Sequence, residues 1–164
     1  SLVGSEMCIR DRSEKEQNAS RATEELTVAL KEQIDQGLIE VEQRDGKVFV
    51  TVGSGGAFPS GTADLTGEAQ RIMDRIALTA MSPDSSITVT GHTDDVPISN
   101  GQFRDNWDLG AGRAASVVQA IQNTGLISGD RLSAVSKGEM APLADNNTAA
   151  GREQNRRIEI EISY

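Results

Sequence analysis

The strongest constraint on the fold is an alternating pattern near the carboxyl end of the chain. Ile158, Ile160 and Ile162 occupy every second position, with Glu159 and Glu161 between them. A period of two places the isoleucines on one face of a β-strand and the glutamates on the other. Such a strand belongs to a sheet with one buried face and one wet face. With three Phe, one Trp and one Tyr in 164 residues, the core must consist of Ile, Val, Leu and Ala.

Other segments predict a mixed sheet with helices packed against it. An Asp45-Gly46 pair between two β-rich runs indicates a hairpin, and apolar residues at helical spacing indicate amphipathic helices. We expect strands at residues 38–43, 47–52, 86–91, 131–136 and 156–163, and helices at residues 67–81, 107–124 and 148–154. The hairpin, and a last strand with one solvent-exposed face, argue against a purely parallel sheet. The predicted fold class is α+β, a two-layer sandwich with helices packed on one face of a mixed β-sheet.

The beginning of the chain differs from the rest. Residues 1–12 fit neither a signal peptide nor a lipoprotein cleavage site, and they resemble a translated sequencing-adapter remnant, so we expect a non-native segment outside the fold. Residues 13–37 predict a charged linker helix that ends at Gly37 and is mainly solvated. Its narrow apolar stripe is Leu26, Leu30 and Ile34. Residues 38–164 are then expected to form the domain.

The overall composition argues against several functions. A net charge of −9 disfavours nucleic acid as a partner, because phosphate binders need a basic face. Cys8 is the single cysteine, and no metal site or cofactor is expected. The glycine-rich residues 53–66 lack the lysine and the spacing of a phosphate-binding loop. We interpret them as a connector with Phe58 as a hydrophobic plug.

Residues 91–114 contain the only histidine and the only tryptophan of the chain, and they could suit metal binding or catalysis. His92 with Asp94 and Asp95 offers possible metal ligands, but one histidine beside adjacent acids defines no ligand geometry. No Gly-x-Ser-x-Gly elbow accompanies His92. Glycoside hydrolysis requires two acids that face each other, and nothing selects Asp108 or Glu139 as the second acid. We therefore predict no catalytic residues.

The same stretch suits the binding of a charged ligand. On the predicted helix, Arg113 lies beside the apolar stripe, seven residues after Asn106 and on the same helical face. A partly buried guanidinium needs an anion. That anion could be an internal partner, Asp94 or Asp108. Alternatively, Asp94 and Arg113 could stay apart and hold the ammonium and the carboxylate of a zwitterion. The residue pattern leaves both possibilities open.

Four motifs in this order resemble the OmpA-like peptidoglycan-binding domain: GHTDD from Gly91, NWDLGAGRAASV from Asn106, KGEMAPLADN from Lys137 and GREQNRRIEI from Gly151. The resemblance covers about residues 48–164. The long loop after Asp94 and the stretch GAFPSGTADL are most similar to the periplasmic domain of flagellar stator B subunits, the MotB and PomB family. Stator relatives often have Leu-Ser-Ala-Ala-Arg-Ala where this chain has LGAGRA, and glycines at these helical positions cost about 1 kcal/mol each.

The resemblance implies a set of ligand-binding residues. Asp94 and Arg113 would hold the zwitterionic end of diaminopimelate in the peptidoglycan stem peptide, while Thr93 and Asn106 would add hydrogen bonds or shape the pocket. The closing motif contributes Asn155 and Arg156, which would line or brace the site. His92 is expected to support the loop.

The resemblance also implies a function and partners. It predicts non-catalytic peptidoglycan binding that anchors a flagellar stator subunit, as a homodimer associated with a stator A subunit. The domain would be periplasmic, and the full-length protein would be anchored in the inner membrane. The alternatives are an OmpA-like wall tether of an outer-membrane protein or lipoprotein and, in a different class, a cell-wall hydrolase.

Overall fold

The computed structural model describes residues 2–164 and contains a five-stranded sheet in the order β1-β2-β5-β3-β4. The β3–β4 pair is parallel, and the other neighbours are antiparallel. The strands are β1 (Ile39–Arg44), β2 (Lys47–Gly53), β3 (Ser86–His92), β4 (Leu132–Gly138) and β5 (Arg157–Ser163). The helices are α1 (Leu2–Ala29), α2 (Lys31–Asp35), α3 (Ser54–Ala57), α4 (Gly67–Ala80), α5 (Asn106–Asn123) and α6 (Ala149–Asn155), with a short 3-10 turn at Gly129–Arg131. The predicted α+β class with a mixed sheet is confirmed.

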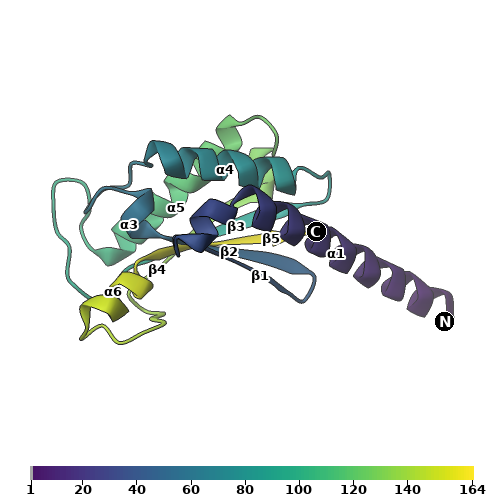
Figure 1. Ribbon diagram of the computed structural model, residues 1–164, viewed down its shortest axis with the longest axis horizontal. Helices are drawn as coiled ribbons and strands as arrows, with labels where there is room; N and C mark the ends of the chain where they lie inside the picture. Colours follow the sequence, from purple (N-terminus) through teal and green to yellow (C-terminus); the bar gives the residue numbers. More distant parts are fainter. Residues whose placement is uncertain (1) are drawn as a thin grey trace.

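The last strand holds the middle of the sheet. β5 pairs with β2 on one side and β3 on the other, so both of its edges are hydrogen-bonded. Ile158, Ile160 and Ile162 are fully buried on the face covered by helices, while the alternating glutamates lie on the opposite face. Figure 1 shows α4 and α5 above this sheet, whereas α6 lies at one end of the molecule. The alternating pattern therefore predicts correctly which face is covered.

The predicted hairpin is present between β1 and β2. Its register pairs Arg44 with Lys47, which leaves a two-residue turn. Asp45 and Gly46 have φ values of 53° and 72°, the positive values that this kind of turn requires at both central positions.

Two glycines allow α5 to lie directly on β3. A Cβ atom on Gly91 would overlap the backbone carbonyl of Gly110, and a Cβ on Gly110 would lie 2.5 Å from Ser136 Oγ. A Cβ on Gly112 would lie 2.9 Å from a ring carbon of Phe103. Both helical glycines thus occupy positions where the chain leaves no room for a side chain. The close approach of Gly110 to Gly91 packs the start of α5 against the end of β3.

The first helix corrects an expectation from the sequence. We expected a mainly solvated linker helix at residues 13–37, but Ala19, Ala22, Leu26 and Leu30 are buried in the core. The helix also breaks at Leu30, before the short α2. A narrow apolar stripe is sufficient to bury one face of this helix, because the small Ala side chains let α1 approach α4 and the hairpin closely. This part of α1 is therefore a structural element of the domain.

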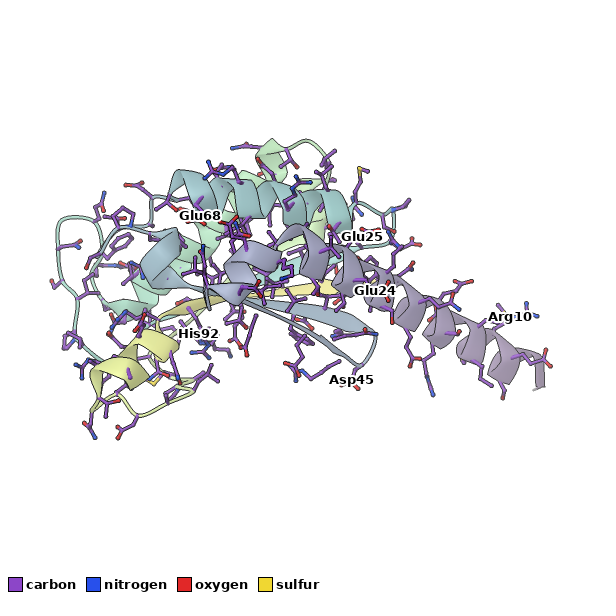
Figure 2. The ribbon with its side chains drawn as sticks, viewed as in Figure 1. Arg10, Glu24, Glu25, Asp45, Glu68 and His92 are labelled. Carbon is purple, nitrogen blue, oxygen red and sulfur yellow. The ribbon has the colours of Figure 1, made fainter. Side chains whose placement is uncertain are left out.

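The start of α1 has a different environment. Figure 1 shows that it projects beyond the sheet, and Arg10 is labelled on this part in Figure 2. Met7 and Ile9 are each 65% exposed. The division between residues 12 and 13 stays a prediction. No helix among residues 2–164 is long and apolar enough to cross a membrane.

Candidate ligand-binding cavity

A cavity of about 560 Å³ lies at one end of the domain, between α3, the start of α5 and α6. The long loop that joins β3 to α5 contributes Val96, Pro97 and Ile98 to the lining, and it projects at the same end as α3 and α6 (Figure 1). Five residues predicted from the sequence line this cavity: Thr93, Asp94, Asn106, Arg113 and Arg156. Four lining residues are ionisable, namely Asp94, Arg113, Arg152 and Arg156. The lining therefore carries three cations and one anion in a chain whose net charge is −9.

Arg113 is the most deeply placed cation. Its residue is 5% exposed, its Nε donates to the carbonyl of Thr62 at 2.7 Å, and its guanidinium carbon lies 4.9 Å from the centre of the Phe58 ring. Burial lowers the pKa of Arg113 to about 10; repulsion by Arg156 also lowers the pKa, and attraction to Asp94 opposes the decrease. Among residues 2–164, the structure records no carboxylate paired with Arg113. The guanidinium thus has a backbone bond and a ring contact, but no counter-ion of its own.

Asp94 forms its ion pair with a different arginine. Its Oδ2 accepts from Arg156 Nη1 at 2.7 Å, and its Oδ1 accepts from the backbone N–H of Val96 at 3.1 Å. The side chain of Arg156 is 38% exposed and that of Asp94 is 12% exposed. Asp108, the other internal partner considered for Arg113, pairs with Arg104 at 2.7 Å. Neither of the two internal salt bridges considered for Arg113 is therefore formed.

Two buried polar residues hold the turn that presents Asp94. Thr93 Oγ1 donates to the carbonyl of Asp94 at 2.8 Å. Asn106 Nδ2 donates to the carbonyls of Asp94 at 3.3 Å and Val96 at 3.1 Å. Asn106 is the first residue of α5, and the Asp105 side chain before it caps the helix by accepting from Asp108 N–H at 2.9 Å. Thr93 and Asn106 thus link the loop to α5 while they line the cavity.

Asn155 is not among the residues that line the cavity. Its side chain is fully buried, and its Oδ1 accepts from the backbone N–H groups of Leu143 at 2.7 Å and Ala144 at 2.9 Å. Its Nδ2 donates to Ala144 O at 2.9 Å and to Asn146 Oδ1 at 2.7 Å. Of the two roles considered for Asn155, the geometry supports bracing of the loop before α6.

Sequence reasoning missed Arg152 as a lining residue. It lies on α6, four positions before Arg156, and four residues is the spacing that places two side chains on the same side of a helix. Its Nη1 donates to the carbonyl of Asn146 at 2.9 Å. The signal was present in the motif GREQNRRIEI, since both arginines belong to it.

His92 is the last residue of β3, and Figure 2 shows it near α6. It is 4% exposed, and its Nε2 contacts the carboxylate of Glu159. Arg157 Nη2 lies 3.3 Å from the same carboxylate. The pKa of Glu159 is lowered mainly by the hydrogen bond from His92 and also by Arg157, against the opposing effect of burial. His92 is not among the cavity-lining residues, and its contact joins β3 to β5.

The fold and this cavity define a two-layer α+β domain with a charged pocket at one end of its sheet. The chain belongs to the OmpA family, whose family model matches residues 57–156. It is 32% identical over 125 residues to Motility protein B of Bacillus subtilis. The aligned region covers 76% of this chain and 48% of that protein. The chain therefore spans about half the length of this curated relative.

Two solved structures share the fold. A putative MotB-like protein from Desulfovibrio vulgaris superimposes with a TM-score of 0.81 at 27% identity, covering 93% of this chain and 94% of that chain. The cell wall anchor of the T6SS from Pseudomonas aeruginosa superimposes with a TM-score of 0.77 at 31% identity, covering 84% of this chain and 96% of that chain. The resemblance stated from the motifs is thus confirmed at the level of family and fold.

Proposed function

We propose that this domain binds peptidoglycan without cleaving it, and that its cavity holds the zwitterionic end of diaminopimelate in the stem peptide. The observation that carries this proposal is that Asp94 and Arg113 line one cavity without pairing with each other. A ligand carboxylate that meets Arg113 would supply the counter-ion that the buried guanidinium lacks. Charge-assisted bonds of this kind are each worth about 1.5–3 kcal/mol.

Asp94 can accept a ligand ammonium group although it is already hydrogen-bonded. Each carboxylate oxygen has two lone pairs, and the structure gives Oδ1 one donor and Oδ2 one donor. The ligand ammonium can use the remaining lone pairs while Arg156 stays in place. Thr93 and Asn106 keep the Asp94 turn in position before the ligand arrives, which lowers the entropic cost of binding.

The binding of a wall peptide would serve as an anchor. In the proposed setting, the domain is the periplasmic part of a flagellar stator B subunit that is held in the inner membrane, forms a homodimer and works with a stator A subunit. The similarity to Motility protein B and to a MotB-like structure supports this assignment. The similarity to a T6SS cell wall anchor supports wall tethering outside the flagellar motor as the second candidate.

Co-sedimentation with purified diaminopimelate-containing sacculi tests the proposal. Wild-type protein should pellet with the sacculi, whereas Asp94→Ala and Arg113→Met should stay in the supernatant. Asp74→Ala and Arg71→Gln are matched controls, because both residues are exposed on α4 and away from the cavity, and they should pellet like wild type. Equal pelleting of wild type, Asp94→Ala and Arg113→Met would show that the site is wrong. Release of soluble muropeptides by the wild type would instead indicate a hydrolase.

A further inference from the structure

The cavity has more positive charge than a zwitterion needs. A zwitterion carries one carboxylate and one ammonium, which Arg113 and Asp94 suffice to match. The lining nevertheless contains two further guanidinium groups, from Arg152 and Arg156. Arg156 is paired with Asp94, so Arg152 is left as a cation for which the described residues provide no carboxylate.

The geometry of Arg152 leaves donors free for a ligand. One of its nitrogens, Nη1, donates to Asn146 O at 2.9 Å, and this is the hydrogen bond that the structure records for its guanidinium among residues 2–164. A guanidinium carries five N–H donors in a planar fork, which suits a carboxylate. The bond to Asn146 also fixes the side chain against the loop, so fewer rotamers are lost when a ligand binds.

Nearby cations strengthen the case for an additional anion. Arg156 repels the charge on Arg113, and this repulsion is one cause of the lowered pKa of Arg113. Three guanidinium groups line one cavity of about 560 Å³, and a second negative charge on a ligand would offset part of this positive charge. A cavity whose lining carries three cations and one anion also attracts negatively charged ligands.

We propose that Arg152 forms a second carboxylate subsite, which binds a free carboxylate of the stem peptide other than the one bound by Arg113. This inference rests on the proposed function and specifies its ligand further: a stem peptide with an unmodified second carboxylate binds best. Two carboxylates of the peptide L-Ala-γ-D-Glu-diaminopimelate-D-Ala have this chemistry, the α-carboxylate of D-Glu and the terminal carboxylate of D-Ala.

Calorimetric titration with three synthetic tetrapeptides separates these sources. The first is the unmodified peptide, the second has the D-Glu α-carboxylate as its amide, and the third has the D-Ala carboxylate as its amide. Wild-type protein should bind one of the two amides about tenfold more weakly than the unmodified peptide, the loss expected for one charge-assisted bond. Arg152→Gln should bind the unmodified peptide and that amide with the same affinity. Arg71→Gln, the exposed control, should keep the wild-type difference.

Each result has a distinct meaning. Equal affinity of the wild type for all three peptides overturns the second subsite and leaves the diaminopimelate site intact. A wild-type difference that persists in Arg152→Gln assigns the carboxylate to another residue and also overturns the inference. If no peptide binds to the wild type, the proposed function fails, and the second subsite fails with it. The comparison of peptides on wild-type protein requires no substitution, so a poorly folded variant cannot obscure it.

Discussion

Asp94 and Arg156 form the ion pair at the cavity, with Oδ2 of the aspartate 2.7 Å from Nη1 of the arginine. The two residues are 62 positions apart in the chain and meet because β5 lies beside β3 in the sheet. Because Asp94 pairs with Arg156, the buried guanidinium of Arg113 has no carboxylate partner among residues 2–164. Under the proposed function, a ligand carboxylate would meet Arg113 and a ligand ammonium group would meet Asp94.

Arg113→Met should separate binding from stability. The buried guanidinium has no ionic partner in the described chain, and its lowered pKa shows that burial disfavours its charge. Replacing a buried charge that has no ionic partner with an apolar side chain removes the cost of burying that charge, while the hydrogen bond to Thr62 is lost. We expect the free energy of unfolding in urea to change by less than about 2 kcal/mol, although binding of the diaminopimelate peptide should weaken at least tenfold. A larger loss of stability would show that Arg113 is mainly structural.

Gly91 should tolerate no side chain. In Gly91→Ala the new Cβ would overlap the carbonyl of Gly110, and backbone has to move to accommodate it. We expect the free energy of unfolding to fall by about 1–3 kcal/mol or more. Gly101→Ala is the matched control, since its Cβ would meet nothing within 4 Å, and it should change stability by less than about 0.5 kcal/mol. Similar urea midpoints for both variants would contradict the close approach of α5 and β3.

Leu26 should matter for stability far more than the first twelve residues do. Leu26 is fully buried in the core, so Leu26→Ala should cost about 2–5 kcal/mol. Removal of residues 1–12 should cost less than about 1 kcal/mol, because residues 4–12 are exposed. Urea denaturation of both proteins measures the difference. A truncated protein as unstable as Leu26→Ala would mean that the domain includes the whole of α1.

Glu159 should make the domain less stable in acid. Its pKa lies below the ordinary value of 4.5 in the folded state, mainly because His92 donates to it. A carboxyl group with a lowered folded pKa contributes stability above its unfolded pKa and loses that contribution as the pH falls through the folded value. The difference in unfolding free energy between wild type and Glu159→Gln should therefore be larger at pH 6 than at pH 3. Glu40→Gln, at an exposed position of β1, should show no such change, and an equal pH dependence for both variants would refute this role of Glu159.

The sequence predicts local features of this molecule well. The alternation of Ile158, Ile160 and Ile162 reports directly which face of β5 is buried, because side-chain direction in a strand depends only on position. The turn at Asp45-Gly46 is equally local, because few residue types adopt positive φ values. Asp94 and Arg113 could be named because they belong to recognisable motifs.

Features that depend on strand order could not be predicted in the same way. The partner of Asp94 could be Arg113, Asp94's neighbour across the cavity, or Arg156, and the choice depends on how β3 and β5 pair. The contact of His92 with Glu159 depends on the same register. The burial of Ala19 and Ala22 was missed because alanine is compatible with both solvated and buried helical faces, and the approach of α1 to the sheet decides between them.

The most direct test of the central claim is calorimetric titration of the wild type with two tetrapeptides that differ in a single carboxylate. One peptide contains diaminopimelate at its third position, and the other contains L-lysine, which has the side-chain ammonium but lacks the adjacent carboxylate. We predict at least tenfold tighter binding of the diaminopimelate peptide, as expected for one charge-assisted bond to Arg113, and no difference between the peptides in Arg113→Met. Equal binding of the two peptides by the wild type would contradict the claim that Asp94 and Arg113 together hold a zwitterion.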